Sequence, residues 1–143
     1  MAQRNESDGY LRGLPQTCSL ERDGHRFFLV HAIPSSPLYG VLDKDSAEWE
    51  AELMLSGADF LLTVHTHIPF IRDVNGRKII NVGSIGQPRN GKLFASYAIY
   101  EDGKFSLHTY SYPVETTIQK TQALPLASHV KEKLIQILAT GTK

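Results

Sequence analysis

The sequence has a single cysteine, Cys18, among 143 residues. One thiol excludes both an internal disulfide and a paired-cysteine metal site, so a metal ion would have to be held by His, Asp, Asn or Glu. No apolar run approaches the ~20 residues that cross a bilayer, and the opening residues, MAQRNESDG, lack the apolar segment of a signal peptide. We therefore expect a cytoplasmic protein with no membrane partner.

Net charge is also lacking, because 15 Lys and Arg residues balance 15 Asp and Glu residues. Without a positive long-range field, nucleic acid is not an expected partner. The length and ordinary composition indicate one domain with one hydrophobic core. Residues 1–9 mix charge, Ser and Gly without a period, and we interpret them as a flexible lead-in to a domain that covers residues 10–143.

Three dipeptides that favour tight turns each separate two β-prone runs. They are Asp23-Gly24, Asn75-Gly76 and Asp102-Gly103. Such pairs suit two-residue hairpin loops, in which both turn residues adopt positive φ. They predict three antiparallel hairpins. Residues 59–64 (DFLLTV) are too few for a helix and too continuously apolar for a half-exposed strand, which favours a strand buried on both faces.

Two segments have helical patterns. Residues 45–56 place Asp45 three positions before Glu48, as in a capping box, and Gly57 follows where a helix C-terminus favours glycine. Residues 127–141 have four apolar residues at helical spacing, and Gly141 marks the expected end of the helix. The four are Val130, Leu134, Ile137 and Leu138. We therefore expect an α/β fold, with a mixed, mostly antiparallel sheet and about two covering helices.

Three of the six histidines follow apolar strands. His31 ends one run and His65 ends another, so both are expected at the rim where strands emerge, which is where open α/β sheets build sites. His67 lies two residues after His65, and an extended backbone would put both rings on one side. Neutral imidazoles bind zinc, manganese or iron. The alternative, that these are structural or solvated histidines, stays open at this point.

Three blocks of the sequence resemble a known family in order and spacing. They are Leu29-Val30-His31, residues 64–70 (VHTHIPF) and residues 81–89 (NVGSIGQPR). They resemble the second half of the calcineurin-like metallophosphoesterases, in the compact prokaryotic phosphodiesterase branch. The resemblance covers the chain from Tyr10 onward and implies part of an α/β sandwich that hydrolyses phosphoesters.

The resemblance also implies roles for individual residues. His31 and His65 resemble ligands of one metal ion and His67 a ligand of the other, in a family that clamps phosphate between two divalent metals. The ions would be Mn, Zn or Fe, up to two if the site is complete. Ser84 and Arg89 correspond to positions at the mouth of the site, where they could meet a substrate oxygen.

The chain departs from the family in what precedes His31. The family supplies its bridging carboxylate and further ligands from D-x-H, G-D and G-N-H-D/E blocks, and this chain has no Gly-Asp pair and no G-N-H sequence. Three readings stay open. The chain could be part of a phosphodiesterase completed by another chain, an inactive remnant that acts as a homo-oligomeric or partner-binding module, or a hydrolase with one zinc ion.

Overall fold

A computed structural model describes residues 6–142 of the chain. The helices and strands, in chain order, are α1 (Glu6–Arg12), β1 (Thr17–Arg22), β2 (His25–Val30), α2 (Trp49–Ser56), β3 (Phe60–Thr63), β4 (Phe70–Val74), β5 (Arg77–Asn81), β6 (Phe94–Glu101), β7 (Lys104–Ser111), α3 (Val114–Ala123) and α4 (Ser128–Thr140). Helix α1 begins inside the range expected to be a lead-in, and residues 1–5 of that range lie outside the described residues.

The three predicted hairpins are all present. Strands β1 and β2, β4 and β5, and β6 and β7 pair antiparallel around the Asp-Gly, Asn-Gly and Asp-Gly turns. All six turn residues have positive φ, between 48° and 79°. Local turn chemistry therefore fixes the register of six of the seven strands.

The strands form two sheets. Five lie in the order β1-β2-β3-β5-β4, and β6 and β7 form a separate two-stranded sheet. Strand β3 is central and runs parallel to both β2 and β5, while the remaining pairings are antiparallel. The mixed, mostly antiparallel α/β fold is thereby confirmed. Phe60 and Leu61, on opposite faces of β3, are buried as expected, but Leu62 is only half-buried.

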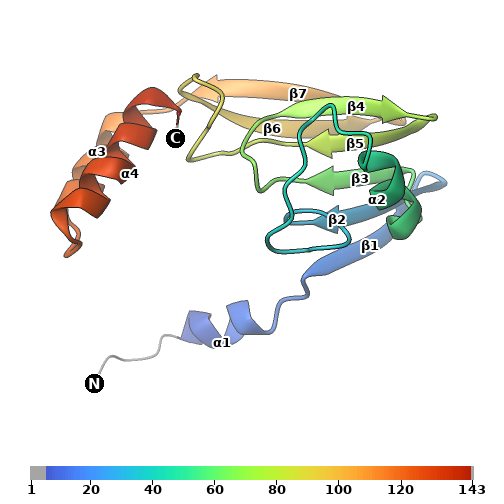
Figure 1. Ribbon diagram of the computed structural model, residues 1–143, viewed down its shortest axis with the longest axis horizontal. Helices are drawn as coiled ribbons and strands as arrows, with labels where there is room; N and C mark the ends of the chain where they lie inside the picture. Colours follow the sequence, from blue (N-terminus) through green and yellow to red (C-terminus); the bar gives the residue numbers. More distant parts are fainter. Residues whose placement is uncertain (1–5, 143) are drawn as a thin grey trace.

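The five-stranded sheet is covered differently on its two faces (Figure 1). One face packs on α2, and its core contains Trp49, Leu53, Leu61 and Ile79, each at most 2% exposed. The other face meets the β6–β7 hairpin through an aromatic cluster. The rings of that cluster belong to Phe27, Phe60, Tyr100 and Phe105.

Helix α2 begins later than predicted. The capping box at Asp45 does not form, and the helix starts at Trp49 with no side-chain cap. The reason is tertiary, because Arg72 donates to the carbonyls of Lys44 and Ser46 at 2.8 and 2.6 Å. These carbonyls are thus turned to the sheet instead of along a helix axis. Gly57 ends the helix at φ 63°, as expected.

The C-terminal helix is confirmed, but its partner differs from the one expected. Helix α4 ends at Gly141 with φ 65°, and it packs against α3, which the sequence analysis does not predict. Figure 1 shows the α3–α4 pair beside the sheet, at the end toward which β2, β3 and β5 point. Of the two helices expected to cover the sheet, only α2 packs on one of its faces. None of the helices between residues 6 and 142 is long and apolar enough to span a membrane.

Candidate functional site

The site is built where two parallel strands end. Strands β2 and β3 run in register, and the chain leaves them at His31 and Val64. The Val64 amide donates to the His31 carbonyl at 3.1 Å, and the Thr63 hydroxyl donates to the Ala32 carbonyl. These bonds hold the two emerging loops together, so residues distant in sequence share one rim.

Two of the three histidines meet at this rim. Nε2 of His31 lies 2.9 Å from Nδ1 of His65, and the two ring centroids are 4.8 Å apart in an edge-to-face arrangement. The juxtaposition follows directly from the parallel pairing of β2 and β3. Two imidazole nitrogens at this separation can share a proton or bind one cation.

The backbone at His65 and His67 is not extended. Their φ angles are 34° and 61°, in the left-handed region that non-glycine residues seldom adopt. The predicted side-by-side arrangement of the two rings on an extended chain is therefore wrong. Nδ1 of His67 instead lies 2.6 Å from the Gln87 carbonyl. If that nitrogen carries the proton, the lone pair of the neutral ring is on Nε2.

A buried asparagine stabilises this turn. Asn81 is 1% exposed, and its Nδ2 donates to the Val64 carbonyl at 2.7 Å and to the Thr66 hydroxyl at 3.1 Å. Its Oδ1 accepts from the Gly83 amide at 2.9 Å. A satisfied buried amide of this kind can hold a strained turn in place. The sequence analysis gave this residue no role, although it is the first residue of the block 81–89 and a polar side chain at the end of an apolar strand.

The donor set is chemically suited to a metal ion but incomplete. Imidazoles suit zinc, manganese and iron. Across residues 6–142, however, no three His, Cys, Asp or Glu side chains are grouped so that they could hold an ion. The chain does contain one D-x-H triplet, Asp23-Gly24-His25, but it forms the β1–β2 turn. It lies at the opposite end of β2 from His31 and cannot supply a bridging carboxylate to the rim.

Ser84 and Arg89 belong to a loop after β5 and have different surroundings. The Ser84 hydroxyl oxygen accepts from the Gln87 amide at 2.9 Å, so it shapes the bend. Burial raises the pKa of Tyr112, whose protonated hydroxyl donates to the Gly86 carbonyl at 3.1 Å and braces the same loop. Nη2 of Arg89 donates to Oε1 of Gln87 at 3.1 Å. Its Nε is buried without a hydrogen-bond partner.

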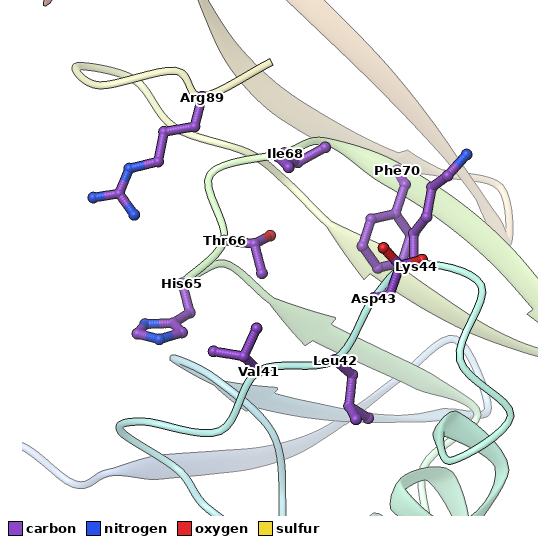
Figure 2. Close-up of a pocket in the computed structure, with 9 residues that line it drawn as sticks. All are labelled: Val41, Leu42, Asp43, Lys44, His65, Thr66, Ile68, Phe70 and Arg89. Atoms are coloured by element: carbon purple, nitrogen blue, oxygen red, sulfur yellow. The ribbon is translucent and has the colours of Figure 1, made fainter. Parts of the chain in front are cut away.

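A cavity of about 530 Å³ lies beside His65. Arg89 lines it, whereas Ser84, His31 and His67 are not among its lining residues. Its size is in the usual range for a small-molecule site. Figure 2 shows the residues that form its walls, which are Val41, Leu42, Asp43, Lys44, His65, Thr66, Ile68, Phe70 and Arg89.

Comparison with known proteins identifies relatives. Residues 3–103 match the model of the calcineurin-like phosphoesterase superfamily domain. The uncharacterized protein MJ0912 of Methanocaldococcus jannaschii is 27% identical over an alignment 154 residues long. The alignment covers 96% of this chain and 61% of the relative. The crystal structure of a metallophosphoesterase from Sphaerobacter thermophilus is 26% identical with a TM-score of 0.81, over 98% of this chain and 65% of that one.

A second solved structure shares the fold. It is the hypothetical protein PH1004 from Pyrococcus horikoshii, with a TM-score of 0.83 and 23% identity. The match covers 96% of this chain and 55% of that protein. The chain thus spans between about half and two thirds of the length of these relatives, with nearly all of its own residues matched.

Proposed function

Because the chain belongs to the calcineurin-like phosphoesterase superfamily, we propose that it forms the histidine-bearing part of a metal-dependent phosphodiesterase-like hydrolase. Another chain, or a second copy of this one, supplies the missing carboxylate ligands. The observation that carries this proposal is the 2.9 Å approach of His31 to His65 at the carboxyl ends of parallel strands. His65 also lines a cavity together with Arg89.

In this proposal the three histidines hold divalent ions. His31 and His65, whose ring nitrogens face each other, would hold one ion, and His67 would hold another with the ring nitrogen that is not directed at the Gln87 carbonyl. A Mn, Zn or Fe ion held there would supply Lewis-acid chemistry for phosphoester hydrolysis. Arg89 binds the phosphate of the ester, because a guanidinium matches phosphate geometry with parallel N–H donors.

The need for a second chain follows from charge and ligand number. Two dications a few ångströms apart repel strongly unless carboxylates lie between them. The described residues hold no cluster of three acidic, cysteine or histidine side chains that could bind an ion. The same observation favours one alternative function, that of a catalytically inactive module that binds a copy of itself or another partner.

Metal titration tests the ligand assignment. Binding of Mn²⁺ and Zn²⁺ to the purified chain is measured by calorimetry, with the metal content checked by elemental analysis. We expect His31→Ala to weaken binding at least about tenfold, the loss typical even of residues that only support a ligand. His129→Ala, at an exposed histidine on α4, is the control and should bind as the wild type does. Equal affinity in all three proteins would exclude His31 as a ligand.

Activity separates the two functions. Hydrolysis of bis(p-nitrophenyl) phosphate with added Mn²⁺ is followed over a range of protein concentrations. If a second copy completes the site, the rate rises roughly with the square of the concentration while dimers are scarce. If a different chain is needed, the protein alone is inactive and turnover begins on adding it. Metal-independent turnover, or metal binding without turnover under every condition, contradicts the phosphoesterase proposal.

A further inference from the structure

The cavity beside His65 has two unlike ends. Figure 2 shows the imidazole of His65 and the guanidinium of Arg89 at the left of the view and Ile68 near its middle. Phe70 lies at the right, next to Asp43 and Lys44. Val41 and Leu42 add further apolar surface from the segment that follows β2. A phosphate held at the histidine and arginine end would therefore point the rest of its ester toward an apolar wall.

The apolar wall is accessible to a ligand. Val41 is 65% exposed and Ile68 is 40% exposed, although both line a concavity. Leu42 and Phe70 are half-buried and pack on the core under α2. Exposed apolar residues that gather in a concave site mark a place where apolar ligand surface can be removed from water.

Two side chains fix this wall in position before any ligand binds. The indole N–H of Trp49 donates to the Asp43 carbonyl at 2.8 Å. Arg72 donates to the Lys44 carbonyl from β4, also at 2.8 Å. The segment that carries Val41 and Leu42 is thereby tied to both α2 and the sheet. Binding against a fixed wall requires little ordering of the protein, which favours affinity.

The charged residues at this end favour a neutral ester group over a charged one. Asp43 and Lys44 have opposite charges, and Oδ1 of Asp43 accepts from the Asp45 amide at 3.0 Å. The Lys44 amine lies 3.6 Å from the Asp45 carboxylate. Asp43 and Asp45 together carry more negative charge than Lys44 offsets, so a neutral group lies on Ile68 and Phe70 at less electrostatic cost than a second anion would. A hydroxyl group placed against Val41, Ile68 and Phe70 would find no hydrogen-bond partner in these side chains to replace water.

We propose that this site takes phosphoesters whose alcohol carries an apolar aryl or alkyl group. That group lies on Val41, Ile68 and Phe70, while the phosphate binds at Arg89. The inference rests on the proposed function for the identity of the ligand as a phosphoester, and it adds the class of alcohol. Discrimination comes from the burial of one apolar group, so it is a preference of about ten- to a hundredfold at most.

The test compares two monoesters of equal charge, phenyl phosphate and glycerol phosphate. Binding to the full chain is followed by NMR of the isoleucine methyl groups, which detects millimolar affinities. We expect phenyl phosphate to bind at least about fivefold more tightly. Its ring should also shift the Ile68 methyl signals, whereas glycerol phosphate should not.

Two isoleucines provide a matched pair of variants. Ile68→Ser removes apolar surface from the wall, and we expect it to lower the preference for phenyl phosphate about threefold. Ile99→Ser, on β6, changes a residue of the same type that is 42% exposed, close to the 40% of Ile68, and should leave the preference unchanged. Arg89→Gln should weaken both esters by the same factor, so their ratio is preserved.

Each outcome decides a separate claim. Equal affinities for the two esters, no detectable binding of phenyl phosphate, or an equal loss in both isoleucine variants overturns the apolar-alcohol inference. Metal-dependent turnover with no preference between the two esters contradicts the apolar-alcohol inference but supports the proposed function. A clear preference in binding, together with a protein that neither binds metal nor turns over, contradicts the proposed function and leaves the cavity as a binding site for apolar phosphoesters.

Discussion

Two adjacent leucines on β3 lie on opposite faces of the same sheet and have different surroundings. Leu61 is fully buried under α2, with Ile79 and Leu53 beside it. Leu62 faces the β6–β7 side and is only half-buried, as are Leu29 and Val82. One face is sealed, while the other is covered by a two-stranded hairpin that leaves part of it open. The open part is apolar and borders the edge strand β1.

The difference indicates where the molecule would accept further structure. The gap on the open face is lined by residues of β1, β2 and β3 and by His31. A chain that packed there would lie next to the histidine rim. The physical need for cover on this face and the chemical need for carboxylates at the rim therefore coincide, which is why we propose a completing chain and not merely an accessory one.

The largest expected effect is at the sealed face. Leu61→Ala removes a fully buried side chain from the core that it shares with Leu53 of α2 and Ile79 of β5. We expect it to lower the free energy of unfolding by about 3 to 4 kcal/mol, the range for leucine deletions that leave a cavity. Urea denaturation followed by circular dichroism measures the change. A loss below about 1 kcal/mol would mean that this face is not closely packed.

The matched change on the open face sharpens the comparison. Leu62→Ala removes the same atoms from the next position on the strand, where water already reaches part of the side chain. We expect a loss of about 1 to 2 kcal/mol, since less apolar surface returns to water and a smaller cavity remains. The same denaturation series provides the measurement. If both leucines cost the same, the open face is covered in solution, and light scattering would then show whether a second copy covers it.

The features that could be predicted from the sequence are those encoded by neighbouring residues. The three hairpins are encoded locally, because Asp-Gly and Asn-Gly pairs accept positive φ at both turn positions. The meeting of His31 and His65 follows from two apolar runs that end in histidine. Helix α3 is hidden by its composition, since three of its ten residues are threonine, which has a low helix propensity.

Other features depend on contacts between distant residues. The late start of α2 and the fixed wall at Val41 both require Arg72, which lies on β4. The left-handed turn at His65 and His67 requires Asn81, at the end of β5. No local pattern around these positions carries that information. The sequence therefore predicts which side chains gather at the rim more readily than how their rings are directed.

The smallest expected effect lies at the other end of β3 and involves neither face. Oδ2 of Asp59 accepts from the Arg26 amide at 2.8 Å, and the Asp59 amide donates back to the Arg26 carbonyl at the same distance. This backbone hydrogen bond, helped by the Arg26 charge, lowers the pKa of Asp59 below its ordinary value of 3.8, although desolvation opposes the shift.

A lowered pKa means that the folded state binds the proton less readily than the unfolded state does. The hydrogen bonds between Arg26 and Asp59 therefore stabilise the fold above the ordinary pKa of 3.8, and this contribution is lost as the pH falls through the lower folded-state pKa. We expect Asp59→Asn to be slightly less stable than the wild type at neutral pH and to converge with it in acid, as measured by urea denaturation at a series of pH values. A gap that stays constant with pH would show that the carboxylate charge is not what joins β2 to β3. The Arg26–Asp59 hydrogen bonds lie at the start of β3, away from both leucine side chains. We therefore expect the ratio between the stability losses of Leu61→Ala and Leu62→Ala to be unchanged in the Asp59→Asn background. An unchanged ratio shows that the joining of β2 to β3 is independent of how the two faces are covered.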